Sequence, residues 1–152
     1  MSCRLMAVAL LACAVLACDD TPSSPRQIGT TGAAALEVDG TWAGSASDST
    51  RQLSMTWRLT QSDRNVTGTF SATTPVGAPI YTAGAITGTV SATALSFTIT
   101  IPRGAVDGSP DCTATLSGTA DDVREDSMAG TYAGSDTCGG TFAGGRFTLL
   151  RQ

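Results

Sequence analysis

The sequence predicts an all-β protein, an antiparallel up-and-down meander that closes into an eight-stranded barrel after an N-terminal signal peptide and a flexible tether. A strand pattern with a central glycine, seen in Val66-Thr-Gly-Thr-Phe70, occurs four times. Apolar and polar residues alternate with period two between turn clusters, and no amphipathic helical pattern follows the signal. Glycines on the apolar face of alternate strands favour a closed barrel over a two-layer sandwich, because a coiled sheet closes where inward side chains are missing.

The first 17 residues are predicted to be an export signal. Arg4 precedes an apolar run over residues 5–17, which is too short to span a bilayer and suits the centre of a signal peptide. The run ends in Val15-Leu16-Ala17-Cys18, which resembles the lipobox of bacterial lipoproteins. The resemblance implies that Cys18 becomes the lipidated N-terminus, and that the mature protein is anchored to a membrane of the bacterial cell envelope.

Two alternatives concern this anchor. Leu10-Leu11-Ala12-Cys13 is a second lipobox-like match behind a shorter apolar stretch, and an ordinary signal peptide without a lipid also fits the composition. Asp19 and Asp20 do not decide between the inner and outer membranes, so periplasmic and outer-surface locations both stay open.

The five cysteines agree with export. Cys3 and Cys13 leave with the signal and Cys18 takes the lipid, so Cys112 and Cys138 remain as one disulfide pair.

Residues 18–38 are predicted to be a disordered tether, because prolines, glycines and small polar residues occur there without apolar periodicity. The barrel domain is predicted to span residues 39–152. Insertion of the tether into a partner's groove is an alternative role for this segment.

Each predicted strand rests on alternation between turn signals. The pattern is cleanest in the second strand, where Leu53, Met55, Trp57 and Leu59 share one face. Proline-containing segments interrupt the meander after the third and fifth strands. The predicted strands are residues 41–47, 52–60, 66–72, 85–93, 94–101, 112–120, 128–136 and 141–150.

The cysteines predict the register of the sixth and seventh strands. If these strands form a hairpin about position 125, facing residues have numbers that sum to 250, and Cys112 and Cys138 meet this condition. They share the parity of Leu116, Met128 and Tyr132, so both cysteines are expected on the apolar face.

Small residues on the apolar face predict an interior that is short of bulk. A barrel of this kind either flattens or keeps a cavity. The residues concerned are Gly68, Gly88, Gly118, Gly130, Ala92, Ala114 and Ala120.

Gly40-Thr-Trp42 together with Val66-Thr-Gly-Thr-Phe70 resembles the calycin barrels, the avidin and lipocalin type, and avidin-like proteins in particular. By this resemblance Phe70 takes the place of a ligand-contacting tyrosine and Ala72 that of a serine, so biotin binding is not expected. The later tryptophans of the family are also missing, since residues 95–101 hold only Phe97. Barrel inhibitors of secreted metalloproteases are similar in size, exported setting and single disulfide.

Composition excludes several classes of function. Histidine and lysine are absent, so imidazole and Schiff-base chemistry have no residue to perform them. The net charge of −4 disfavours nucleic-acid binding. No catalytic residue, metal site or cofactor is predicted, and the protein is expected not to be an enzyme. A hydrolase that uses a carboxylate pair stays a minor alternative.

Acidic residues cluster in one predicted turn, residues 121–126. They offer oxygen ligands for calcium, but their spacing is not that of an EF-hand loop, and a solvated hairpin tip is the simpler interpretation. Asp107-Gly-Ser109 is likewise interpreted as a turn and not as a protease motif.

The predicted function is binding of a small apolar ligand inside the barrel. The rival is a protein-interaction or protease-inhibitor-like lipoprotein that meets an envelope protein through its loops, residues 73–79 or 102–110. Trp42 and Trp57 are interpreted first as core residues. The residues expected to line the interior are Trp42, Trp57, Phe70, Phe97 and Tyr132.

Overall fold

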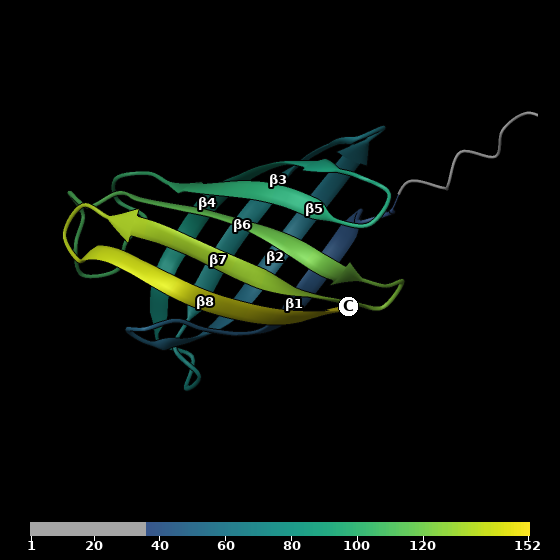
Figure 1. Ribbon diagram of the computed structural model, residues 1–152. Coiled ribbons are helices and arrows are strands. Elements are labelled where there is room, and N and C mark those ends of the chain that lie inside the picture. The colour runs from purple at the N-terminus through teal and green to yellow at the C-terminus, as the bar shows by residue number, and fades with distance from the viewer. Residues whose placement is uncertain (1–35) are drawn as a thin grey trace, which may run out of the picture. The chain divides into compact units, whose positions relative to one another are not determined.

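The structure is a computed structural model, and it describes residues 36–152. The predicted signal, Cys18 and most of the tether lie outside the described residues. Eight antiparallel strands pair in chain order and the last pairs with the first, so the barrel is closed as predicted (Figure 1). The strands are β1 (Gly40–Ser47), β2 (Gln52–Ser62), β3 (Asn65–Thr73), β4 (Pro79–Val90), β5 (Leu95–Ile101), β6 (Ala114–Val123), β7 (Ser127–Asp136) and β8 (Gly140–Arg151). Residues 36–152 contain no helix long and apolar enough to cross a membrane.

The prediction around β4 was wrong at both ends. β4 begins at Pro79, six residues earlier than predicted, because the proline opens the strand, where a missing N–H is tolerated. Register shifts between β3 and β4 hide the alternation there. The strand ends at Val90, and Ser91 accepts and donates hydrogen bonds with Ala94 to form a tight turn. Ala92 therefore lies exposed in a turn and not inside the barrel.

The predicted register of β6 and β7 is confirmed. Ala114 pairs with Asp136 and Ala120 with Gly130, and both pairs sum to 250. Cys112 and Cys138 form the predicted disulfide, although they lie just outside the strand ends and only Cys112 is buried. The strand therefore starts two residues later than predicted, while the pairing of the two cysteines follows the ladder.

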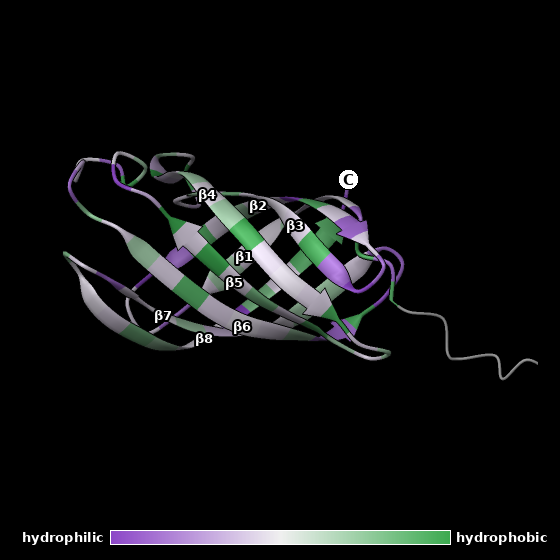
Figure 2. Ribbon diagram, turned by 90° about the horizontal axis from the view of Figure 1, so that it is seen from above, coloured by the Kyte–Doolittle hydropathy of each residue, from purple (hydrophilic) through white to green (hydrophobic). Residues whose placement is uncertain are grey.

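The core follows from the alternation along the strands, which Figure 2 shows as changes between green and purple or white. Inward apolar side chains from all eight strands form one cluster, and apart from tyrosines and tryptophans no polar or charged side chain among the described residues is buried. Trp57, Phe97 and Phe147 meet at the centre, with ring centroids 4.8, 5.2 and 5.7 Å apart. These rings fill the middle of the barrel.

Aromatic rings lie where inward glycines lack side chains. A Cβ on Gly118 would lie 2.7 Å from Cζ of Phe97, and one on Gly130 would lie 2.9 Å from Cζ of Phe147. The glycines were predicted to leave part of the interior unfilled, but aromatic rings at the paired positions of neighbouring strands fill that space. This arrangement compensates for glycine within a curved sheet.

The end of the barrel at which β1 begins is closed by a short segment, residues 36–39. Val38 is fully buried, and the amide side chain of Gln61 accepts from Val38 N and donates to the Leu36 carbonyl. The Trp42 indole donates to the Val38 carbonyl, and the Arg151 guanidinium lies 4.4 Å from the centroid of the Trp42 ring. Residues 36–38, predicted as the end of the tether, thus pack against the barrel.

Candidate functional site

The opposite end of the barrel carries the β1–β2, β3–β4, β5–β6 and β7–β8 connections, and we call it the loop end. Polar and aromatic side chains converge there from turns and strand ends that are far apart in the sequence. We call this group the mouth cluster. It consists of Asp48, Arg51, Tyr81, Tyr132 and Phe142.

Arg51 reaches the mouth because it continues the inward face of β2. It precedes Leu53 by two residues, so its side chain has the parity of the core series of that strand. Its guanidinium lies 5.0 Å from the centroid of the Tyr81 ring and 5.8 Å from that of Phe142. Nη2 donates a hydrogen bond to the Tyr81 hydroxyl.

One donor of Arg51 is left without an acceptor. Its Nε is shielded from solvent, and none of the residues 36–152 accepts a hydrogen bond from it. Leaving such a donor unpaired costs about 1–3 kcal/mol. The guanidinium also forms no ion pair with any carboxylate of the described chain.

Asp48 organises the β1–β2 turn with its own side chain. Oδ1 accepts from the Thr50 amide, the Thr50 hydroxyl and the Arg51 amide, and Oδ2 accepts from the Tyr132 hydroxyl at 3.1 Å. Partial burial alone would raise the pKa of Asp48, but these hydrogen bonds outweigh it and hold that pKa below its usual value. Asp48 is therefore a carboxylate at neutral pH.

Both tyrosines at the mouth are poor acids. Burial raises the pKa of Tyr132, and the Asp48 carboxylate raises it further through its charge and its hydrogen bond. Burial also raises the pKa of Tyr81, although the positive charge of Arg51 opposes the shift. Both phenols are therefore neutral donors at physiological pH.

Glycines place the rings of Tyr132 and Phe142. A Cβ on Gly145 would lie 2.6 Å from the Tyr132 ring, and one on Gly134 would lie 2.7 Å from the Phe142 ring. The two rings pack edge to face at a centroid distance of 6.2 Å. Their positions therefore depend on bare backbone in β7 and β8.

The long β5–β6 loop, residues 102–113, covers one side of the mouth. Thr82 N donates to the Ala105 carbonyl and Asp107 N donates to the Ile80 carbonyl, so the loop pairs with the beginning of β4. Ala105 is only 4% exposed, which shows that the loop packs against the core beside Tyr81.

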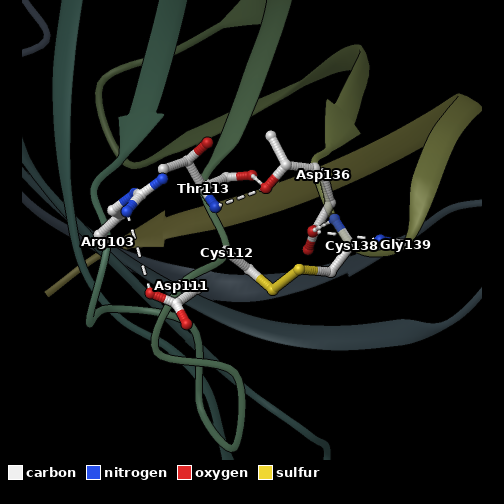
Figure 3. Close-up of a disulfide and its surroundings, with 8 residues drawn as sticks. Arg103, Asp111, Cys112, Thr113, Asp136, Cys138 and Gly139 are labelled. Carbon is white, nitrogen blue, oxygen red and sulfur yellow. Dashed lines mark hydrogen bonds and ion pairs between the residues drawn. A yellow bond between two sulfur atoms is a disulfide. The ribbon is translucent and has the colours of Figure 1, made fainter.

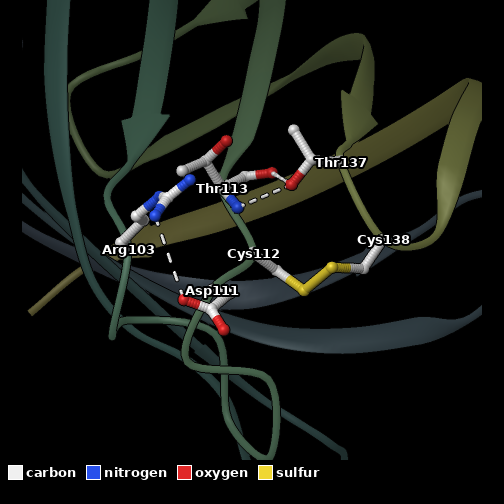
Figure 4. A network of polar contacts seen from close by, with 6 residues as sticks. All are labelled: Arg103, Asp111, Cys112, Thr113, Thr137 and Cys138. Atoms are coloured by element: carbon white, nitrogen blue, oxygen red, sulfur yellow. Dashed lines mark hydrogen bonds and ion pairs between the residues drawn. A yellow bond between two sulfur atoms is a disulfide. The ribbon is translucent and has the colours of Figure 1, made fainter.

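The disulfide fixes this loop to the β7–β8 turn, as Figure 3 shows. Beside it, Thr113 N donates to the Thr137 hydroxyl at 2.9 Å, while Thr137 N donates to the Thr113 carbonyl (Figure 4). The Arg103–Asp111 ion pair, 3.9 Å long, is exposed on both sides and contributes little. The β5–β6 loop is therefore held in place by the disulfide and by backbone hydrogen bonds, and not by the ion pair.

The structure separates the five residues predicted to line the interior. Trp57 and Phe97 belong to the packed centre, and Trp42 belongs to the closed end. Phe70 lies 6.0 Å from the Tyr81 ring, between centroids, and Tyr132 is a member of the mouth cluster. These last two are the ones nearest the loop end, and both are buried.

Sequence reasoning missed Asp48, Arg51, Tyr81 and Phe142 as site residues. Parity offered a signal for Arg51, since a charged residue just before β2 that shares the parity of its inward face is unusual. Tyr81 was hidden by the register shifts in β4. No local pattern joins Asp48 to Tyr132, which lies 84 residues away.

Other predicted or possible sites lie apart from the mouth cluster. Asp122 pairs with Arg124 at the exposed β6–β7 hairpin. Within the described chain, the grouping Cys112, Asp136 and Cys138 has both sulfurs in the disulfide and so offers no thiolate to a metal. A groove of about 380 Å³ lies on the outer wall, lined by β1, β2, β8 and Pro75.

Comparisons with known proteins agree with the architecture. No family model matches the sequence, and no curated protein matches it. Among solved structures, the barrel is similar to EF1p2_mFAP2b bound to DFHBI, with 18% identity over 75% of this chain and 93% of that chain at a TM-score of 0.57. It is also similar to the redesigned barrel mFAP1 bound to DFHBI, with 16% identity over 75% and 94% of the chains at 0.53. A third match, a de novo designed fluorescence-activating β-barrel, has 17% identity over 76% and 94% at 0.51. At these identities the likeness concerns the fold: the chain is an eight-stranded antiparallel β-barrel similar to designed ligand-binding barrels.

Proposed function

We propose that this protein is a lipid-anchored, non-enzymatic barrel of the bacterial cell envelope that binds a small apolar ligand at its mouth cluster. The observation that carries the proposal is Arg51, whose shielded and unpaired Nε lies beside the Tyr81 and Phe142 rings. Small-molecule sites commonly combine apolar walls with a few convergent polar groups.

The packing of the barrel places the ligand at the rim. Trp57 lies six residues beyond Arg51 on the same face of β2, which corresponds to about 20 Å along the strand. The space between them holds core side chains such as Leu53 and Met55, both nearly fully buried. A small ligand would therefore meet the mouth rings before the central tryptophan, and these rings must part to admit it, because Tyr81 and Phe142 are 1% and 5% exposed. The designed barrels similar in fold are described as bound to DFHBI, which is compatible with this use of the architecture.

The ligand proposal is tested by equilibrium dialysis of the full chain in lipid nanodiscs with decanoate, menadione and haem, using empty nanodiscs to subtract partitioning. We expect saturable binding of at least one probe, weakened about tenfold by Phe142→Ala because one buried ring contact is lost. Thr87→Ala, on the outer wall, is the matched control and should leave binding unchanged. Absence of saturable binding for all three probes would reject the proposal.

The anchor is tested by fractionation. If Cys18 carries the lipid, Cys18→Ala moves the protein out of the membrane fraction, while Cys13→Ala leaves it there. Membrane attachment that survives Cys18→Ala but not Cys13→Ala would assign the lipid to the second motif. If both variants stay in the membrane fraction, the protein is anchored in another way.

A protein partner at the loop end is the second candidate, and Val76 favours it. This side chain is 92% exposed at the tip of the β3–β4 loop. Backbone and side-chain hydrogen bonds to Thr74 from Gly77 and Ala78 hold the loop in shape. An ordered loop with an apolar tip, beside the outer-wall groove next to Pro75, suits insertion into a partner's pocket.

The partner hypothesis is tested with two matched substitutions, each of which replaces an exposed apolar residue by glutamate. Within the described part of the chain, Leu150 is the other large apolar residue that is well exposed, at 55%. A partner captured from envelope extract by the wild type and by Leu150→Glu, but not by Val76→Glu, would support contact through the loop. Equal capture by all three proteins would exclude the loop as the contact.

A further inference from the structure

The donors of Arg51 exceed the acceptors that the barrel provides for them. A guanidinium has five N–H donors in a fixed fork and no acceptor of its own. Among residues 36–152, its side chain makes one hydrogen bond, from Nη2 to the Tyr81 hydroxyl, and Nε has no partner. A ligand oxygen reaches this donor only if the rings around it part, because Nε is shielded and the Tyr81 and Phe142 side chains are buried.

The two nearest acids do not serve as that acceptor. Both oxygens of Asp48 accept from the β1–β2 turn and from Tyr132. Oδ1 of Asp136 accepts from Cys138 N and Gly139 N in the β7–β8 turn. Both carboxylates are thus engaged with their own turns, Asp136 through Oδ1 alone, and neither forms an ion pair with the guanidinium.

The charges around the mouth decide between a neutral and an anionic ligand. Arg51, Asp48 and Asp136 all lie at the loop end, Asp48 bonded to the β1–β2 turn and to Tyr132, and Asp136 bonded to the β7–β8 turn. Together they carry one positive and two negative charges. A ligand carboxylate would gain from Arg51 but would be repelled by two fixed carboxylates, whereas a neutral carbonyl would accept the hydrogen bond without that repulsion.

We propose that the mouth cluster takes a small apolar molecule with a neutral carbonyl oxygen, such as an aryl ketone or a quinone, and that Arg51 donates to this oxygen. The Tyr81 and Phe142 rings, which now flank the guanidinium, would part and contact the apolar body. This inference rests on the proposed function, because it names the ligand class of the same site.

Three naphthalenes of similar shape test the carbonyl: 2-acetylnaphthalene, 2-ethylnaphthalene without an acceptor, and the anion 2-naphthoate. Binding to the full chain in nanodiscs is measured by equilibrium dialysis at neutral pH, with empty nanodiscs as the blank. We expect 2-acetylnaphthalene to bind about tenfold or more tightly than the other two, as a hydrogen bond to a charged donor predicts.

Variants assign that preference to one side chain. Arg51→Met should remove the preference for 2-acetylnaphthalene over 2-ethylnaphthalene, and Arg51→Lys should keep part of it. Arg146→Met is the matched control on the outer wall and should keep all of it. If circular dichroism shows that Arg51→Met does not fold, the preference for 2-acetylnaphthalene over 2-ethylnaphthalene is compared between Arg51→Lys and the wild type instead.

Each other result has a defined meaning. Equal binding of the ketone and the ethyl compound, or a preference that survives Arg51→Met, overturns the inference but leaves ligand binding intact. Tighter binding of 2-naphthoate overturns the neutral-ligand argument, and loss of the preference in Arg146→Met moves the site to the outer groove. Absence of binding by all three probes, together with a negative result for decanoate, menadione and haem, rejects the proposed function itself.

Discussion

At the scale of single residues, one hydrogen bond couples two side chains that sit on different strands and turns. Tyr132 donates to Asp48, so the bond stabilises the charged form of the acid and the neutral form of the phenol. Burial raises the pKa of Tyr132 and this bond raises it further, while in Asp48 burial is outweighed by the hydrogen bonds from Thr50, Tyr132 and Arg51, which lower the pKa. Stability is therefore expected to fall at both extremes of pH, for opposite reasons.

On the alkaline side, a phenol with a raised pKa in the folded state keeps its proton after the unfolded chain has lost it. Its contribution is fully present below about pH 10, the ordinary pKa of tyrosine, and is lost as the pH rises above that value. In Tyr132→Phe the urea concentration at the unfolding midpoint should therefore decrease less steeply between about pH 9 and pH 11 than in the wild type. Tyr81→Phe should reduce this slope less, and an unchanged slope in Tyr132→Phe would contradict the coupling.

On the acid side, the lowered pKa of Asp48 means that the unfolded state binds a proton first as pH falls. The contribution of Asp48 is present above its ordinary pKa of about 4 and is lost as pH drops through the lower folded value. Asp48→Asn should make the urea midpoint less sensitive to acid between about pH 5 and pH 3. A slope as steep as that of the wild type would show that other carboxylates cause the acid sensitivity.

At the scale of strands, glycine allows the walls of the barrel to approach the rings. A Cβ on Gly118 would lie 2.2 Å from the Thr131 carbonyl oxygen and 2.7 Å from Phe97. Neither atom can retreat without moving a paired strand or a central ring. The glycine pattern therefore records close packing and not empty volume.

Gly118→Ala should lower the free energy of unfolding by about 3 kcal/mol, since overpacking of a dense core forces shifts in backbone and rotamers. Gly139→Ala is the matched control, because its Cβ would have its nearest neighbour at 3.7 Å, an ordinary contact distance. We expect that variant to stay within about 0.5 kcal/mol of the wild type in urea unfolding. Comparable values for both variants would mean that the walls are looser than the structure indicates.

The strands and the disulfide were predictable because they depend on local periodicity and on the parity of two cysteines. The early start of β4 was not, because register shifts and a proline break the period there. The turn at Ser91–Ala94 was not predictable either, because residues 91–94 include no glycine, proline, asparagine or aspartate to mark a turn. The filled centre was also missed, since composition cannot show that Phe97 lies over Gly118. The mouth cluster was missed because its members meet only when the barrel closes.

At the scale of the whole molecule, closure depends on the end of the chain. β8 pairs with β1 from Trp42 to Ser47, and Arg151 completes that seam. Its guanidinium lies over the Trp42 ring and donates to the carbonyls of Glu37, Asp39 and Glu125. One side chain thereby joins the closing segment, the first and last strands and the β6–β7 turn.

Arg151→Met should destabilise the fold by about 2 kcal/mol, through loss of a cation–π contact and of partly exposed charged hydrogen bonds. Arg146→Met, on the same strand, should change stability by no more than about 0.5 kcal/mol, since among residues 36–152 no partner carboxylate pairs with Arg146. The stabilities of the two variants are compared by urea unfolding monitored by circular dichroism. A loss in Arg146→Met as large as that in Arg151→Met would show that closure does not depend on this contact.

The seam between β1 and β8 also bears on synthesis of the protein. A nascent chain that stops before residue 140 lacks the strand that covers β1 and β7, and both would display unpaired N–H and C=O groups. Such a fragment is a template for intermolecular strand pairing. A premature stop codon just ahead of the codons for β8 is therefore expected to yield insoluble material rather than a slightly shortened barrel.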